Sequence, residues 1–333
     1  MHVFRCVLAC AGLAVFGASL LGADVRGRAL EILRTHAQDG HRIISEYNAL
    51  PLEFSSPSGT TIRFSRSTDF MQYIKGSSES GILGSLSTAV HEICHGLTAR
   101  KGAQMRLSSG ATASGGGAYL LNGRYLFVPY NGQIFPSHKV KSMIPKRLRT
   151  TRFETYVEDD DEAMGTQQEG IYGQLDEWHA YYHDMLASVD LWSYYRAKSR
   201  LTADECADFF AGIDGTLYAY GEFKLYLLAC LRYARERVPQ AYQAYLGNTA
   251  FRTVVLELDQ AFSSLIARYF AMKPTVIAHM RVQGHDVRDE GDTIWIGETG
   301  RGTFRKEWKL LETALSSQPW VREFAAVRSG VWR

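Results

Sequence analysis

The sequence predicts an α+β fold in which helices predominate. Long stretches with the 3.6-residue spacing of amphipathic helices fill the chain from Gly165 onward. Two-residue alternation, which is typical of strands, is confined to short segments near residues 51–65, 119–128 and 287–304. The 333 residues are 46% hydrophobic and 22% charged, so the chain can bury one large core or two smaller ones.

Residues 1–23 have the features of an export leader. Met1 to Arg5 carry one positive charge, the run that follows is apolar or small, and Ala23 offers a small residue for cleavage. Leu21 fits poorly three residues before the cleavage point, where a small residue is usual, so the sequence defines this point only to within a few residues. A retained membrane anchor is the alternative, because the apolar run is near the lower length limit for a span. We expect a periplasmic or secreted protein with no stable membrane insertion after leader removal.

The part of the chain before residue 150 mixes helices and short strands. The expected elements are a helix over Arg26–Asn48, two strands within Pro51–Ser65, a helix around Leu83–Leu97 that runs on to Arg100 or Lys101, and a hairpin over Tyr119–Val128 that turns at Asn122-Gly123. The strands within 51–65 either offer an edge to an extended peptide or simply cover the core. The Ser108–Gly117 segment is predicted to be a linker or a mobile lid.

The part after residue 150 is predicted to be mainly helical. A basic stretch, Lys139–Arg152, leads to the acidic run Glu158–Glu162, expected as a solvated loop, with a Ca²⁺ site or a contact with a basic surface as alternatives. The later expected elements are helices over Tyr181–Lys198, Ala203–Phe210, Thr216–Arg237 and Phe251–Met272, a hairpin over Val287–Phe304 with turns at Glu290–Asp292 and Gly300–Gly302, and a last helix near Lys306–Ser316. We divide the chain into a leader (1–23), an α+β part (24–150) and a mainly helical part (151–333).

The motif with the clearest chemistry is His91-Glu92-Ile93-Cys94-His95, which lies within the apolar run 83–97. On a helix, residues four apart share one face, so His91 and His95 can direct two imidazoles at a single Zn²⁺. Glu92 can take a proton from a water molecule at the metal. Alternatively, the two histidines are core residues and Glu92 faces solvent.

At His91, Glu92 and His95 the sequence resembles the zincin metallopeptidases. The resemblance implies a zincin-like catalytic core with a small N-terminal β-sheet and a helical C-terminal half, one Zn²⁺ per chain, two histidine ligands and Glu92 as general base. Zincins with a third histidine carry H-E-x-x-H-x-x-G-x-x-H, but here Thr98 and Lys101 stand at the last two positions. The third ligand is therefore expected on a later helix, as in the gluzincins, where it is a glutamate.

Glu177 is the preferred third ligand. The segment Glu177-Trp178-His179-Ala180 resembles the E-x-x-A helix of several gluzincins. Tyr181, Asp184, Ala180 and Gly173 share its helical face, and the two small residues are expected to bring this helix close to the His91 helix.

Two alternatives remain at this site: which aspartate holds a ligand histidine, and which glutamate is the third ligand. Asp176 or Asp184 is expected to accept a hydrogen bond from the outer nitrogen of a ligand histidine. Glu169, two turns earlier, is the alternative ligand, and either glutamate is otherwise a surface acid.

The reaction also needs a donor to the developing oxyanion. Tyr181 and His183 are our candidates, with His179 and Tyr182 nearby. The chain has 18 tyrosines, so a packing role is the alternative for any one of them.

Three cysteines follow the leader, Cys94, Cys206 and Cys230, and so few do not make a disulfide scaffold. Cys206 and Cys230 either pair or stay as buried thiols. Cys94 as a catalytic nucleophile beside His91 or His95 is disfavoured by the presence of Glu92 and the metal-ligand spacing.

These patterns predict an exported zinc-dependent peptidase that acts on a peptide or protein substrate. The net charge of +2 gives no indication of a nucleic-acid partner. The alternative is a non-catalytic binding or structural protein on the same scaffold. A third possibility, hydrolysis of cell-wall peptide crosslinks, ranks below proteolysis.

Overall fold

The computed structural model describes residues 14–110 and 115–331, and in the described part the chain is mostly helical with three small antiparallel sheets. The α-helices are α1 (Ala14–His36), α2 (Gln38–Ala49), α3 (Glu79–Ser109), α4 (Gly165–Glu169), α5 (Ile171–Asp190), α6 (Trp192–Ala197), α7 (Ala203–Leu217), α8 (Ala219–Arg237), α9 (Pro239–Gly247), α10 (Thr249–Val282), α11 (Arg305–Leu315) and α12 (Trp320–Ser329). The strands are β1 (Glu53–Ser55), β2 (Thr61–Arg63), β3 (Gly116–Leu121), β4 (Arg124–Pro129), β5 (Val287–Asp289), β6 (Thr293–Ile296) and β7 (Thr299–Gly302). Four short helical turns are η1 (Phe70–Tyr73), η2 (Ser137–Met143), η3 (Lys146–Leu148) and η4 (Glu154–Glu158). The predicted class, α+β with helices predominating, is confirmed.

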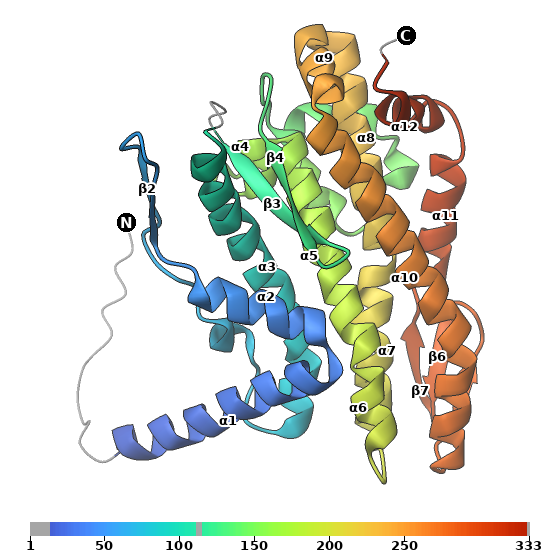
Figure 1. The fold of residues 1–333 in the computed structure, drawn as a ribbon. Helices are drawn as coiled ribbons and strands as arrows, with labels where there is room; N and C mark the ends of the chain where they lie inside the picture. Colours follow the sequence, from blue (N-terminus) through green and yellow to red (C-terminus); the bar gives the residue numbers. More distant parts are fainter. Residues whose placement is uncertain (1–13, 111–114, 332–333) are drawn as a thin grey trace, which may run out of the picture.

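The predicted first helix, 26–48, is two helices. The chain leaves helical geometry at Ala37, where φ is −137° and ψ is 70°. Gly40, in the first turn of α2, lies so close to α3 that an added Cβ would be 2.8 Å from Val90. Figure 1 shows α2 crossing α3 while α1 extends away from the body of the molecule. The predicted leader overlaps the start of α1, and its first 13 residues lie outside the described residues.

Helix α3 carries the His91 motif and is longer than predicted. Ser78 caps its start by accepting a hydrogen bond from the Gly81 amide, and Gly110 ends it in the left-handed conformation, with φ 67°. The predicted end near residues 100–101 was wrong, because the helix continues through Gly102 to Ser109. A Cβ at Gly102 would lie 2.3 Å from the Gly116 carbonyl, so this glycine allows β3 to cross directly over α3.

Both predicted N-terminal hairpins are present. β1 pairs with β2 in an exposed two-stranded unit, and β3 pairs with β4 through a turn in which Asn122 and Gly123 have φ of 50° and 73°. Positive φ at both turn residues is what a two-residue hairpin with type I′ geometry requires. β3 is almost fully buried, and it packs against both α3 and α5.

The second half places α5 between α3 and the C-terminal helices, with α8 and α10 running alongside it (Figure 1). Helices α9 and α12 were not predicted, and the predicted 251–272 helix continues past Pro274 to Val282. The last sheet turns at Glu290–Asp292 as expected, but its second turn lies at Gly297-Glu298. Gly297 has a φ of 59°, whereas the predicted turn residues Gly300–Gly302 belong to β7.

Three smaller predictions, on the cysteines, the acidic run and the membrane, can also be compared with the structure. Cys94, Cys206 and Cys230 are buried free thiols, so the 206–230 pairing is absent. All five residues of the acidic run are exposed, and Glu158 forms an ion pair with Lys141 of the basic stretch. Among the helices of the described chain, none combines the length and hydropathy needed to cross a membrane.

Candidate metal centre

Helices α3 and α5 bring three predicted ligands together. His91 and His95 are one turn apart on α3, and their Nε2 atoms are 3.2 Å from each other. Glu177 faces them from α5, with its Oε2 atom 3.7 Å from His91 Nε2 and 3.6 Å from His95 Nε2. Residues separated by 82 positions in the sequence therefore converge on one point.

These separations fit a tetrahedral zinc ion. Two ligands each about 2.0–2.1 Å from a tetrahedral zinc lie about 3.3 Å apart. The carboxylate atom Oε2 of Glu177 is buried and has no hydrogen-bond partner among the described residues. A buried acceptor without a donor is costly, and a cation between the three side chains would remove that cost. The donor set, two imidazoles and a carboxylate, is one that zinc accepts.

Glu169, the alternative ligand, does not join this group. It lies at the end of α4, near Asp176 and away from His91, and lines a separate small cavity. Burial raises the pKa of its carboxyl to about 7, and the nearby Asp176 adds to the shift.

Two aspartates of α5 lie behind the histidines, as expected. The Nδ1 atom of His95 is 2.7 Å from Asp176 Oδ2, so Nδ1 is occupied by this hydrogen bond and Nε2 is the nitrogen that faces the other two side chains. Asp184 Oδ2 is 3.9 Å from His91 Nδ1, beyond hydrogen-bond distance. An aspartate therefore orients the ring of His95 through a hydrogen bond, whereas His91 has no such bond to Asp184.

The electrostatics of the group follow from its burial. Burial and the neighbouring His95 keep the pKa of His91 well below its usual value, so its ring is neutral. Burial also lowers the pKa of His95, but Asp176 and Glu177 outweigh it and raise that pKa to about 10. Burial raises the pKa of Glu177 to about 7 against the opposing effect of His95. Without a metal, the positive charge of the group resides on His95.

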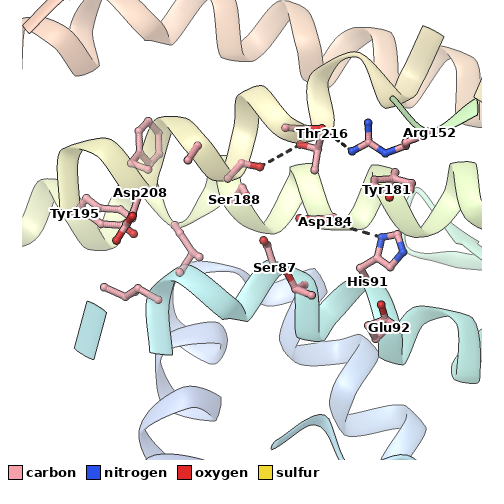
Figure 2. A pocket seen from close by; sticks show the side chains of 18 of the residues that line it. Ser87, His91, Glu92, Arg152, Tyr181, Asp184, Ser188, Tyr195, Asp208 and Thr216 are labelled. Carbon is pink, nitrogen blue, oxygen red and sulfur yellow. Dashed lines mark hydrogen bonds and ion pairs between the residues drawn. The ribbon is translucent and has the colours of Figure 1, made fainter. Parts of the chain in front are cut away.

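Glu92 lies next to this group at the edge of a cavity. Figure 2 shows Glu92 next to His91 on α3, and both residues line the cavity. Tyr73, at the end of η1, is close enough for the negative charge of Glu92 to add to the burial effect that raises the tyrosine's pKa. The predicted base thus has access to the space in front of the ligands.

Tyr181 also lies beside the three candidate ligands. It contacts Tyr156 and Arg152, two residues that the sequence did not indicate as part of the site. Its ring meets His91 edge-on at 4.4 Å between centroids, and its hydroxyl is 3.2 Å from the hydroxyl of Tyr156. The Arg152 guanidinium lies 4.4 Å above the Tyr181 ring. Tyr156 is near enough to hydrogen-bond Glu177, which lowers the pKa of that carboxyl slightly. Arg152 precedes η4 and Tyr156 lies within it, and this segment has no periodic sequence pattern that would have indicated either residue.

The structure does not bring His183 to the ligands. Its Nε2 atom is 2.9 Å from the Leu120 carbonyl, and the residue is buried against β3. The carbonyl can only accept, so Nε2 carries the hydrogen. We therefore assign His183 no part in the chemistry.

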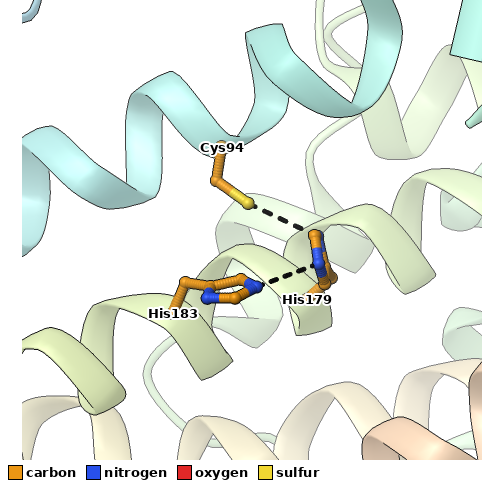
Figure 3. Close-up of side chains that lie close together, drawn as sticks. All are labelled: Cys94, His179 and His183. Carbon is orange, nitrogen blue, oxygen red and sulfur yellow. Dashed lines mark hydrogen bonds between the residues drawn. The ribbon is translucent and has the colours of Figure 1, made fainter. Parts of the chain in front are cut away.

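His183 belongs instead to a second cluster with Cys94 and His179 (Figure 3). His179 accepts a hydrogen bond from the Leu120 amide at Nε2, 3.0 Å away, and its Nδ1 is 3.4 Å from the Cys94 sulfur. One ligand atom of each residue lies within 4.8 Å of the others, but the Nε2 atoms of both histidines are already hydrogen-bonded to Leu120. The cluster is better explained as hydrogen bonding that fastens β3 to α3 and α5.

No family model, curated protein or solved structure matches this chain.

Proposed function

We propose that this protein is a zinc-dependent peptidase with a zincin-like site of the glutamate-ligand type. The observation that carries the proposal is the convergence of His91 Nε2, His95 Nε2 and Glu177 Oε2 at separations of 3.2–3.7 Å. The base expected from the motif, Glu92, lies beside them and lines an adjoining cavity. This combination is what metal-assisted hydrolysis of an amide requires.

Bound at His91, His95 and Glu177, a zinc ion would supply a Lewis acid that polarises the scissile carbonyl and lowers the pKa of a water molecule in front of it. Glu92 accepts a proton from that water as the oxygen attacks the carbonyl carbon. Glu92 then gives the proton to the amine nitrogen as the C–N bond breaks, so one carboxylate serves as base and acid in turn.

Tyr156 and Tyr181 are the proposed donors to the oxyanion. Their hydroxyls lie 3.2 Å apart at the same cavity, and Tyr156 is adjacent to Glu177. Arg152 holds this pair in place by stacking on Tyr181, and its positive charge favours a developing negative charge nearby.

We also propose that the protein acts outside the cytoplasm. The support is the leader pattern of residues 1–23, and the test is the size and compartment of the mature chain after expression with and without these residues.

The first test separates metal binding from chemistry. We expect the purified wild-type chain to hold one zinc ion, His91→Ala to lose it, Glu177→Ala to bind it weakly and Glu169→Ala to keep it, as measured by elemental analysis after dialysis. The glutamate pair is the matched control, because both carboxyls are partly buried and only one faces the histidines.

The second test addresses the reaction. Glu92→Gln should keep its zinc and hydrolyse fluorogenic peptides about 10²–10⁴-fold more slowly than wild type. If Glu92→Gln retained most of the rate, the assigned base would be wrong. If the wild type bound zinc and hydrolysed no peptide, the binding-protein alternative would replace the peptidase.

A further inference from the structure

Glu222 of α8 is an acidic side chain that is completely buried and does not line the cavity beside the candidate metal centre. Its carboxylate accepts three hydrogen bonds from one short segment of the chain. The Thr150 hydroxyl and the Arg152 amide donate to Oε1, and the Arg152 guanidinium donates to Oε2 over 2.8 Å. Burying a carboxylate is costly, and these donors offset the cost. Glu222 therefore anchors residues 150–152 to α8.

The anchored segment leads directly to Tyr156. It lies between η3 and η4, outside any helix or strand, so no regular hydrogen-bond pattern fixes its course. The Arg152 carbonyl accepts a hydrogen bond from the Tyr156 amide over 3.0 Å, which connects the anchored residues to η4. The Tyr156 carbonyl also accepts one from the Gln174 side chain of α5 over 2.9 Å. The position of Tyr156 is therefore set by contacts with α8 and with α5.

Arg152 connects Glu222 to the second tyrosine of the pair, Tyr181. Its guanidinium carbon lies 4.4 Å from the centre of the Tyr181 ring and 4.8 Å from that of Tyr218, and it also donates to the Gly215 carbonyl over 2.6 Å. Figure 2 shows Arg152 beside Tyr181 at the end of the cavity that carries His91. Only 14% of the Arg152 side chain is exposed, so without Glu222 its charge would be buried and uncompensated, which is strongly unfavourable.

We propose that Glu222 is a positioning residue for the reaction. Through Arg152 and residues 150–156, it holds the Tyr156 and Tyr181 hydroxyls, 3.2 Å apart, where they donate to the oxyanion. The inference rests on the proposed peptidase function, because it takes these two tyrosines as the oxyanion donors. Donors stabilise a developing charge best when they are already in place before the reaction. A displacement of about 1 Å can cost about 100-fold in rate.

The kinetic test removes the charge of Glu222 and keeps its shape. We expect zinc-loaded Glu222→Gln to keep its metal and to hydrolyse fluorogenic peptides with a kcat about 10- to 100-fold below wild type. KM should change little, because the lost interaction is one made in the transition state. A wild-type kcat in Glu222→Gln would overturn the positioning role.

Glu323→Gln is the matched control. Glu323 is also completely buried and accepts hydrogen bonds from Arg235 over 2.8 Å and from Tyr242 over 3.1 Å, but it does not line the cavity. Both substitutions break a buried ion pair, so both should lower the urea midpoint. Only Glu222→Gln should lower kcat, and an equal loss of kcat in Glu323→Gln would mean that the effect is one of stability.

A double variant covers the case in which Glu222→Gln folds poorly. Removing one partner of a buried ion pair is strongly destabilising, whereas removing both can be nearly neutral. Arg152→Gln/Glu222→Gln should therefore regain urea stability, and its kcat should equal that of Arg152→Gln alone, because Glu222 acts through Arg152. Recovery of kcat together with stability would overturn the inference.

A spectroscopic measurement makes the inference independent of turnover. NMR of the zinc-loaded full chain, with tyrosines isotope-labelled at Cζ, reports the surroundings of each hydroxyl, and Tyr156→Phe and Tyr181→Phe assign the two signals. We expect both signals to shift in Glu222→Gln and neither to shift in Glu323→Gln. Unshifted signals in Glu222→Gln would overturn the positioning role and leave the peptidase proposal in place. Shifted signals in a chain whose wild type hydrolyses no peptide would overturn the peptidase proposal and keep the link from Glu222 to the tyrosines.

Discussion

At the scale of single residues, the candidate centre depends on which nitrogen each histidine presents. Asp176 accepts a hydrogen bond from His95 Nδ1 at 2.7 Å, whereas Asp184 stays 3.9 Å from His91 Nδ1. A carboxylate bound to the outer nitrogen fixes the ring's tautomer and makes the inner nitrogen a stronger ligand. Of the two histidines proposed as ligands, only His95 therefore has its outer nitrogen fixed by an aspartate.

This asymmetry makes a quantitative prediction. Asp176→Asn should weaken zinc binding about 10- to 100-fold, because the amide can still accept the hydrogen bond but lacks the charge that strengthens the ligand. Asp184→Asn, on the same face of α5, should weaken zinc binding much less. Competition with a chromophoric chelator measures both, and equal losses would contradict the unequal roles.

The sequence pattern indicates the three candidate ligands, but it gives no indication of the residues beside them. His91, His95 and Glu177 lie on regular helices, where spacing reports the shared face. Arg152 and Tyr156 lie in an irregular stretch that reaches the site only through the tertiary fold. His183 is six residues after Glu177, which turns it about 120° away on the helix. Helical geometry alone therefore disfavoured it as an oxyanion donor.

At the scale of elements, β3 is held against α5 by side chains as well as by its pairing with β4. The Leu120 amide donates to His179, and the Leu120 carbonyl accepts from His183. β3 also packs on α3, where Gly102 and Gly116 approach closely. These contacts set the position of α5, and hence of Glu177, relative to the two histidines.

A substitution at His183 separates this structural role from a catalytic one. His183→Ala should lower the free energy of unfolding by about 1–3 kcal/mol, because it leaves the buried Leu120 carbonyl with one donor fewer. His183→Gln, whose amide can donate in its place, should recover part of the loss. Urea denaturation gives the stabilities, and peptide hydrolysis by the folded fraction should stay near wild type. A loss of kcat without a loss of stability would restore His183 to the chemistry.

The elements themselves were predictable where a local signal marks them. Asn122-Gly123 located the β3–β4 turn, because both positions need positive φ. The end of α3 was misplaced, because Gly102 inside it reads as a helix end in sequence but serves the crossing of β3. Ala37 gave no signal for the break between α1 and α2, and the close approach of Gly40 to Val90 just after it is a tertiary contact that sequence spacing does not report.

At the scale of the whole molecule, the proposed ligands come from the two sides of the sequence boundary that we placed at residue 150. His91 and His95 belong to the first part, and Glu177 belongs to the second. Arg152, just past that boundary, bonds to the fully buried Glu222 of α8 and stacks on Tyr181 of α5. Assembly of the site therefore requires both parts of the chain to be folded on each other.

Zinc should consequently stabilise the entire fold. An ion that binds only the assembled site adds RT ln(1 + [L]/Kd), about 2.7 kcal/mol at a concentration 100 times Kd. For a chain of 333 residues that raises Tm by about 4 °C, and a chelator should reverse the rise. Glu92→Gln should show the full rise, because Glu92 is not a ligand, and His91→Ala should show almost none. Calorimetric scans with and without zinc measure this, and an equal rise in His91→Ala would mean that the stabilising zinc binds elsewhere.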